Sequence, residues 1–324
     1  MRARIAGTGF YAPERILTNA DLERMVETSD EWIVERTGIR ERRLAAPGEA
    51  CSDLGVKAAE RALAAAGVAA SDLDIVLLAT CTGDSPLPST ACLIQHRIGA
   101  TNAAACDIGA ACCGFVYALA VGDAYVRTGM RHVLVIGSEV MSSITNWQDR
   151  NTCILFGDGA GAVVVSATKE HRGILSSHLH SDGSLWNLIC VPGGGSRMPP
   201  TEKMLADELQ YIKMRGNETF KVAVKTLEES AREALAANNL TVKDLDVYVP
   251  HQANARILKA VANRLDLPMD KVVMNVDRYG NTSAASIPIA LDEAVRDGRI
   301  TKGKLVMLSA FGSGLTWATS VMRW

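Results

Sequence analysis

An internal repeat constrains the fold of this 324-residue chain more than any other feature of its sequence. The segments 62–65 and 72–75 reappear as 234–237 and 244–247, which is an offset of 172 residues (244 − 72). Two further pairs of segments follow the same offset: 118–119 with 290–291, and 132–136 with 304–308. Ala-rich helices and Val-rich strands can match by chance, but several separate segments in one register favour a duplication.

Each half alternates helical patterns with short apolar runs that are rich in β-branched residues. These runs are 75–80, 133–138, 162–166, 247–249 and 304–309. Continuous apolar strands predict sheets that helices cover on both faces, and two such halves would share one helical layer. The sequence therefore predicts an α/β protein with two core units, which fits a length above the ~250–300 residues that one core supports.

We expect three parts along the chain. Residues 1–166 form the first half and carry a candidate nucleophile, and residues 216–324 form the second half. Residues 167–215 have no recognisable counterpart in the first half. Because this stretch contains Pro192–Gly195 and Pro199-Pro200, we expect it to be an insertion of connecting loops near a site.

Composition argues against several classes of function. Hydrophobic residues make up 48% of the chain, and no stretch approaches the ~20 unbroken apolar residues of a membrane helix. The net charge of −2 argues against nucleic acid as a partner. The N-terminus lacks the apolar region of a signal peptide, so we expect a cytoplasmic protein with no membrane association. The eight cysteines form no C-x-x-C pair and no cluster with histidine, so no metal site is expected.

Cys112 is the first candidate for catalysis. It precedes a helical pattern over residues 115–126 and would therefore lie at a helix N-terminus. The positive end of the helix dipole favours the thiolate and would lower the thiol pKa. The same segment is equally compatible with two buried cysteines, Cys112 and Cys113, at the start of a core helix.

Two segments of the second half carry further candidates. His251 follows the apolar run 247–249, and strand ends in α/β sheets are where ligands gather. The segment 280–286 aligns with the Cys112 segment at the offset of 172 (284 − 112). Duplicated loops would face each other, so Asn281 and His251 could meet Cys112. The Gly-rich turn 311–315 follows a predicted strand and could aim a backbone N–H into the same site.

These segments resemble the β-ketoacyl-acyl carrier protein synthase III family, which starts bacterial type II fatty acid synthesis. The resemblance covers the chain from end to end and rests on 7–11, 28–33, 36–39, 107–115, 156–162, 249–254, 280–284 and 311–317. It implies a thiolase-like five-layered αβαβα sandwich of two duplicated halves. It also implies a catalytic triad of Cys112, His251 and Asn281.

The resemblance implies a decarboxylative Claisen condensation. Cys112 would take an acyl group from acyl-CoA, and the backbone N–H groups of Cys112 and Ser313 would hold the oxyanion. Malonyl-acyl carrier protein would then lose CO₂, and neutral His251 and Asn281 would stabilise the enolate. The resemblance also implies a homodimer. The condensation requires neither a metal nor a redox cofactor.

The resemblance also implies residues that bind CoA. They are Thr28, Trp32, Arg36, Arg150, Phe220, Asn254 and Arg256. Trp32 and Arg36 stand one helical turn apart after a Thr28-x-x-Glu31 capping box, and they could clamp an adenine ring.

Two other features concern the acyl group and the carrier protein. Leu87 stands where a Phe of the partner subunit often limits the acyl pocket, so a smaller wall there would admit primers larger than acetyl. A basic face for an acidic carrier protein would consist of Lys221, Arg256, Lys259 and Arg264.

Other functions of related enzymes agree with this sequence to different degrees. A thiolase needs a second catalytic cysteine near Ser313, where this chain has none, and an elongating synthase has a second histidine in place of Asn281. A specialised condensing enzyme that loads an unusual polyketide or quinolone starter fits nearly as well. A non-catalytic scaffold subunit is disfavoured by the intact triad.

Overall fold

Two β-sheets, one of five strands and one of four that match the first four of the other, form the frame of the computed structural model, which describes residues 2–324. The first sheet runs in the order β1 (Arg2–Tyr11), β7 (Asp158–Thr168), β6 (His132–Val140), β4 (Ile75–Ala79) and β5 (Ala104–Ile108). The second runs in the order β8 (Gly173–Ser181), β13 (Thr316–Arg323), β12 (Leu305–Gly312) and β11 (Val247–Pro250). In each sheet an antiparallel edge adjoins parallel central strands.

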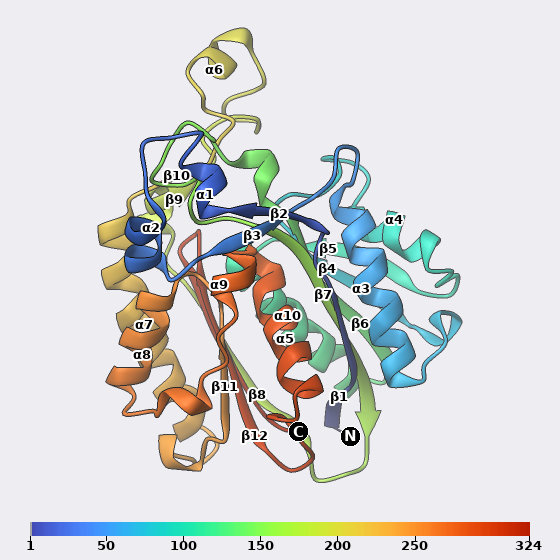
Figure 1. Ribbon diagram of the computed structural model, residues 1–324. Coiled ribbons are helices and arrows are strands. Elements are labelled where there is room, and N and C mark those ends of the chain that lie inside the picture. The colour runs from blue at the N-terminus through green and yellow to red at the C-terminus, as the bar shows by residue number, and fades with distance from the viewer. Residues whose placement is uncertain (1) are drawn as a thin grey trace.

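Helices form three layers around the two sheets (Figure 1). The central layer consists of α5 (Gly114–Arg127) and α10 (Ser286–Arg296), which share one hydrophobic core with strands of both sheets. The outer layers consist of α3 (Cys51–Ala66) and α4 (Thr90–Arg97) on the first sheet, and of α7 (Gly216–Ala236) and α8 (Ala255–Arg264) on the second. The five predicted layers are therefore confirmed.

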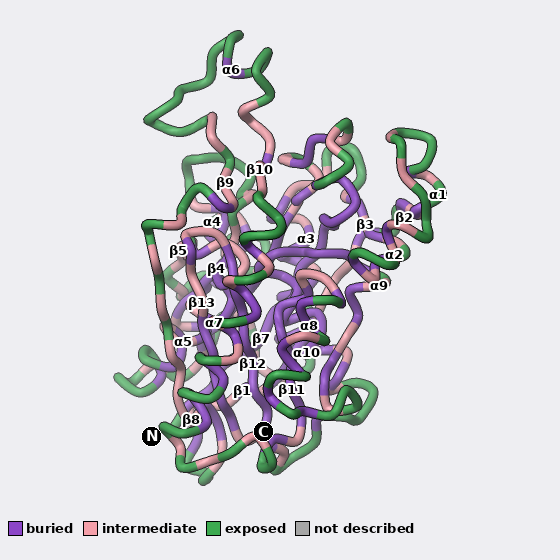
Figure 2. Tube along the Cα trace, turned by 90° about the vertical axis from the view of Figure 1, so that its left-hand side faces the viewer, coloured by how far each residue is buried: buried purple, intermediate pink, exposed green. Residues whose placement is uncertain are grey.

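The helical periodicity of the sequence explains which faces these layers bury. The buried positions of α7 include Thr219, Ala223, Leu227, Ala231 and Ala234, which recur every three to four residues and form one buried stripe. The helix α10 lies between the sheets and is buried on nearly every side. Figure 2 shows the same division along the trace, with buried residues concentrated in the sheets and the central helices.

The predicted duplication is confirmed by the element boundaries. The strands β4 and β11 begin 172 residues apart (247 − 75), as do the helices α5 and α10 (286 − 114). The short 3-10 turns Ala111–Cys113 and Ser283–Ala285 obey the same offset. The turn that carries Cys112 thus has a structural equivalent beside Asn281.

The expectation that 167–215 is an insertion of loops without a counterpart is wrong at its start. Residues 173–181 form β8, which pairs with β13 at the edge of the second sheet as β1 pairs with β7 in the first. Serines and histidines fill much of β8, so its sequence hides the apolar run that marks the other strands. We propose that the second half begins near β8.

The remainder of this stretch and the N-terminal region cover the open end of the sheets. The connecting segment forms β9 (Ile189–Cys190), α6 (Glu202–Ala206) and β10 (Lys213–Met214), and α6 projects from the molecule (Figure 1). The N-terminal cover consists of β2 (Arg15–Thr18), α1 (Asn19–Leu22), α2 (Asp30–Thr37) and β3 (Glu41–Leu44), which lies beside α9 (Val276–Tyr279). Within residues 2–324, no helix has the length and apolar content needed to cross a membrane.

The two halves approach so closely at Gly137 that a side chain there would overlap the opposite half. A Cβ atom on Gly137 would lie 2.3 Å from the carbonyl oxygen of Ala284. We expect Gly137→Ala to lower the free energy of unfolding by about 1–3 kcal/mol, as overpacking of a core does. Urea unfolding followed by circular dichroism measures this change.

Gly183→Ala is the matched control, because a Cβ atom on Gly183 would have no neighbour within 4 Å. Equal stability of the two variants would show that the halves do not pack as closely as described.

Candidate active site

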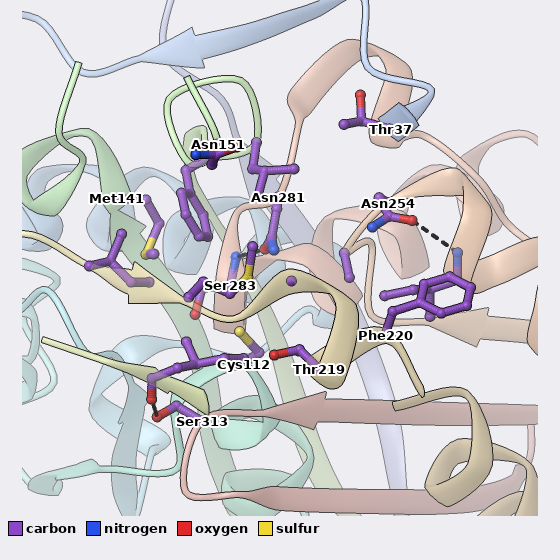
Figure 3. A pocket seen from close by; sticks show the side chains of 18 of the residues that line it. Thr37, Cys112, Met141, Asn151, Thr219, Phe220, Asn254, Asn281, Ser283 and Ser313 are labelled. Atoms are coloured by element: carbon purple, nitrogen blue, oxygen red, sulfur yellow. Dashed lines mark hydrogen bonds between the residues drawn. The ribbon is translucent and has the colours of Figure 1, made fainter. Parts of the chain in front are cut away.

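A cavity of about 1010 Å³ lies between the two halves and contains the three predicted catalytic residues. Cys112 comes from the first half, whereas His251 and Asn281 come from the second. Figure 3 shows the Cys112 side chain in the middle of the cavity, near Asn281 and Ser283. The structure therefore brings the predicted triad together, although the three residues are far apart in sequence.

A constrained turn holds Cys112 at the start of α5. Ala111 adopts a φ of 45°, which is unusual for a residue with a side chain and marks a strained turn. Gly312 of β12 lies directly against the turn: a Cβ atom there would be 2.9 Å from the Cys112 backbone nitrogen and 3.0 Å from its Cβ. Only glycine at this position lets β12 pass so close to the thiol.

The protonation state of Cys112 differs from our expectation. The side chain is partly open to the cavity but shielded from bulk solvent, and this burial raises the pKa of its thiol to about 11. The hydroxyl of Ser283 opposes the increase, and the nearby carboxylate of Glu139 adds to it. This direction is opposite to the lowering that we predicted from the helix N-terminus, because desolvation outweighs the hydrogen bonds that favour the thiolate. The thiol holds its proton at neutral pH.

His251 is a buried and neutral imidazole. Its ring Nδ1 lies 2.6 Å from the Ser286 hydroxyl oxygen, which also accepts a hydrogen bond from the Gln252 N–H at 3.3 Å. Because this oxygen already accepts one proton donor, its own proton can go to Nδ1, which leaves the imidazole proton on Nε2. Burial lowers the pKa of His251 to about 4, so the ring is uncharged at neutral pH.

The side-chain amide of Asn281 is oriented by its own turn. Its Oδ1 accepts a hydrogen bond from the Ser283 N–H at 2.9 Å, so the NH₂ group remains to serve as a donor in the cavity. Its backbone N–H donates to the Leu155 carbonyl at 2.8 Å, and its carbonyl accepts from the Gly157 N–H at 3.1 Å. Asn281 and His251 can thus both present neutral N–H donors.

Ser313 lies on the cavity wall at the end of β12. Its hydroxyl donates to the Ile189 carbonyl at 2.6 Å and is thereby directed away from the thiol (Figure 3). The positive φ of this turn falls on Gly314 (140°), so a serine fits at position 313.

Most of the predicted CoA-binding residues line the cavity, and Arg150 lies next to it against Trp32. The guanidinium carbons of Arg36 and Arg150 lie 4.9 and 4.8 Å from the centre of the Trp32 ring. Arg256 lies 5.5 Å from the centre of the Phe220 ring. Two aromatic rings, each with an adjacent cation, offer stacking surfaces of the kind that a nucleotide base uses.

The two other predicted CoA-binding residues, Asn254 and Thr28, lie inside and outside the cavity lining. Asn254 lines the cavity and caps α8, because its Oδ1 accepts from the Ile257 N–H at 2.9 Å. Thr28 lies outside the cavity lining, and its buried Oγ1 has no hydrogen-bond partner within residues 2–324. The expected capping box at Thr28 is wrong: α2 begins after Ser29, whose hydroxyl accepts from the Trp32 N–H.

The remaining predicted residues lie at the rim or away from the cavity. Lys221 and Arg256 are exposed at its lining, and Lys259 is exposed one turn further along α8. Arg264 pairs with Glu228 at 3.0 Å. Leu87 does not line the cavity, and its side chain is 85% exposed.

Several residues around the site were not predicted from the sequence. Ser283 and Ser286 fall within a segment that was recognised, but only the fold shows what their hydroxyls contact. Glu139 is fully buried and accepts hydrogen bonds from the Cys81 N–H and the Thr80 hydroxyl, at 3.1 Å each. The sequence holds one weak sign that Glu139 matters: it directly follows the predicted apolar run 133–138, and carboxylates are rarely buried.

Comparisons with known proteins agree on one family. Family models described as 3-oxoacyl-[acyl-carrier-protein] synthase III and its C-terminal part match residues 106–183 and 235–324. A protein of Caldanaerobacter subterraneus subsp. tengcongensis, named β-ketoacyl-[acyl-carrier-protein] synthase III, is 54% identical over 99% of this chain and 98% of its own.

Solved structures give the same result. The 3-oxoacyl-[acyl-carrier-protein] synthase III of Aquifex aeolicus is 44% identical, with a TM-score of 0.93 over 99% of this chain and all of its own. The priming β-ketosynthase of the R1128 polyketide biosynthetic pathway is 36% identical, with a TM-score of 0.92 over 99% of this chain and 96% of its own.

Burial of His251 makes stability depend on pH. The pKa falls from 6.5 to about 4 on folding, so the unfolded chain binds an additional proton between these values. The His251 contribution is fully present above pH 6.5 and is lost as the pH falls towards 4. We expect acidification from pH 7 to 4.5 to remove about 2.5 kcal/mol through this residue.

His251→Asn lacks the titrating group and should lose that much less stability over the same pH interval, as measured by urea unfolding at each pH. An identical pH dependence of wild type and variant would contradict the burial of a neutral imidazole.

Proposed function

The chain belongs to the β-ketoacyl-[acyl-carrier-protein] synthase III family. This family of acyltransferases has the thiolase-like fold and initiates fatty acid synthesis. From this premise we propose a mechanism for the cavity. The enzyme transfers an acyl group from acyl-CoA to Cys112 and condenses it with malonyl-acyl carrier protein. The observation that carries the proposal is the convergence of the Cys112 thiol and two neutral N–H donors, His251 and Asn281, on one cavity.

In the first step, the Cys112 sulfur attacks the thioester carbonyl carbon of acyl-CoA. The oxyanion accepts hydrogen bonds from the backbone N–H groups of Cys112 and Ser313, and each such donor typically lowers the barrier by about 2.7–4 kcal/mol. The carbon–sulfur bond to CoA then breaks. Because the Cys112 thiol starts protonated, its proton leaves with the departing CoA thiol.

In the second step, the malonyl thioester loses CO₂, and the electron pair of the broken bond forms an enolate. The Nε2–H of His251 and the NH₂ group of Asn281 donate to the enolate oxygen. The carbanion attacks the carbonyl carbon of acyl-Cys112, the Cys112 thiolate leaves, and a β-ketoacyl-acyl carrier protein results. The thiolate then takes up one proton from solvent, which restores the thiol. This sequence of steps requires only a thiol, an imidazole and amide donors.

The aromatic and basic residues of the outer cavity support a CoA site. We propose that Trp32, Arg36 and Arg150 hold the adenine, and that Phe220 and Arg256 flank the remainder of the molecule. Asn254 also lines the cavity, whereas the Thr28 hydroxyl is buried outside its lining and is a weaker candidate for CoA binding.

We propose that the carrier protein docks at the basic rim of the cavity. Lys221, Arg256 and Lys259 are exposed there and would attract an acidic surface. Arg264 contributes less charge, because Glu228 already neutralises part of it.

We also propose a homodimer. The strand β5 is the free edge of the first sheet, and a large apolar side chain, Leu87, is 85% exposed near it. In a dimer, Leu87 of one copy would close the acyl pocket of the other and set the size of the primer.

A specialised priming synthase is the second candidate. Its support is the 36% identity to the priming β-ketosynthase of a polyketide pathway, together with Leu87 at the proposed pocket wall. Fatty acid initiation is favoured by the 54% identity to a synthase III.

The two proposed steps can be separated with single substitutions. Cys112→Ala should form no acyl-enzyme, whereas His251→Ala and Asn281→Ala should still form it and should release CO₂ at least about 100-fold more slowly, as loss of one catalytic donor does. Intact-protein mass after incubation with acetyl-CoA and CO₂ release from malonyl-acyl carrier protein measure the two steps.

Cys113→Ala is the control, because its thiol is fully buried beside the nucleophile. An acyl adduct on Cys112→Ala, or normal CO₂ release by Asn281→Ala, would refute the proposed roles.

Leu87→Phe should narrow the range of primers. We expect the ratio of octanoyl to acetyl transfer to fall at least about tenfold, since a few methylene groups in a tight pocket give that discrimination. The control is Leu205→Phe, because Leu205 of α6 is exposed at 55% and lies far from the cavity lining. A monomer in sedimentation, or an unchanged ratio in a dimer, would overturn the role of Leu87.

A further inference from the structure

Arg42 of β3 is a fully buried cation that the proposed reaction does not use. Its side chain is 0% exposed, and burial is the main reason that the pKa of its guanidinium falls to about 10. Within residues 2–324 it forms no salt bridge with a carboxylate. A buried charge without a counter-ion is unfavourable, so a structural gain elsewhere must offset it.

The guanidinium bonds to oxygens of two separate segments. Nη1 donates to the Leu17 carbonyl at 3.2 Å and to the Asn19 Oδ1 at 2.9 Å. Nη2 donates to the Ile154 carbonyl at 2.8 Å. Arg42 therefore connects the hairpin of β2 and β3 to the segment that begins at residue 154.

The segment tied by Arg42 is the one that holds Asn281. The Leu155 carbonyl accepts the Asn281 N–H, the Gly157 N–H donates to the Asn281 carbonyl, and Phe156 forms a parallel bridge with Asn281. Asn281 thus forms a bridge with Phe156, two residues after Ile154, whose carbonyl Arg42 binds.

The stem of Arg42 also packs directly against both sides of this bridge. A Cβ atom on Gly157 would lie 3.0 Å from the Arg42 Cβ, and one on Gly280 would lie 3.3 Å from it. Gly280 immediately precedes Asn281, and its φ of 64° sets the direction in which the chain enters the site. The hydrogen bonds of the guanidinium and the packing of the aliphatic part of Arg42 together restrict the Asn281 backbone.

We propose that Arg42 is a positioning residue that places the Asn281 amide for decarboxylation of the malonyl thioester. The inference rests on the proposed function of Asn281. Cys112 lies outside this network, on the turn before α5 and against Gly312 of β12. Loss of Arg42 therefore slows CO₂ release more than it slows acylation of the thiol.

The test compares Arg42→Met, which keeps the stem and removes the charge, with Arg42→Lys, which keeps a charge and part of the hydrogen bonding. At saturating acyl-CoA, Arg42→Met should acylate within about threefold of wild type and should release CO₂ at least about tenfold more slowly. Arg42→Lys should recover part of the decarboxylation rate. Arg43→Met is the matched control, because Arg43 is the next residue of the same strand and pairs with Glu41.

A double-mutant cycle separates this idea from general destabilisation. If Arg42 acts through Asn281, Arg42→Met in an Asn281→Ala background should slow CO₂ release by less than about threefold more. Multiplicative losses, equal loss of both steps, or normal decarboxylation in Arg42→Met would overturn the inference. If Arg42→Met does not fold, the same comparisons with Arg42→Lys decide.

The outcome for Asn281→Ala alone distinguishes the two proposals. Normal CO₂ release in that variant would refute the proposed function and this inference with it. Slow release in Asn281→Ala combined with a fully multiplicative effect of Arg42→Met would refute the inference alone.

Discussion

The close approach of two duplicated turns is the contact on which the rest of the structure depends. The turns Ala111–Cys113 and Ser283–Ala285 stand at equivalent positions of the two halves, and both contain a residue with side chain at positive φ. Gly137 lets β6 pass against Ala284, where a Cβ atom would not fit. Neither half contains the whole site, so the packing of the halves creates the cavity in which Cys112 and Asn281 meet.

Burial gives this cavity its chemical character. Desolvation raises the pKa of the Cys112 thiol to about 11 and lowers that of His251 to about 4, so both groups are uncharged at neutral pH. A cavity of neutral donors suits a reaction in which negative charge appears only during the reaction, first on a tetrahedral intermediate and then on an enolate. The Ser286 hydroxyl can donate to Nδ1 of His251, which favours the Nε2–H tautomer, and the Ser283 N–H orients the amide of Asn281.

Features that depend on repeats and motifs could be predicted from the sequence, whereas features that depend on how deeply a side chain is buried could not. The duplication was predictable because separate segments share one offset. The meeting of Cys112, His251 and Asn281 in one cavity was predictable because their segments match motifs of a recognised family. The strand β8 was missed because an edge strand tolerates polar residues. The thiol pKa was predicted in the wrong direction because sequence indicates a helix N-terminus but not the degree of burial. Only one weak sign in the sequence separates buried Arg42 from its neighbour Arg43: Arg42 shares a face of the short strand β3 with the apolar Leu44.

The pH dependence of CO₂ release by pre-acylated enzyme tests most directly the central claim, that decarboxylation is driven by neutral donors. Pre-acylation removes the titration of Cys112, so His251 becomes the relevant titrating group of the triad. With a His251 pKa of about 4, the single-turnover rate should stay constant between about pH 5.5 and 8. A rate that changes with a midpoint near pH 6.5 would show that the imidazole titrates as an exposed histidine does, and it would contradict the account.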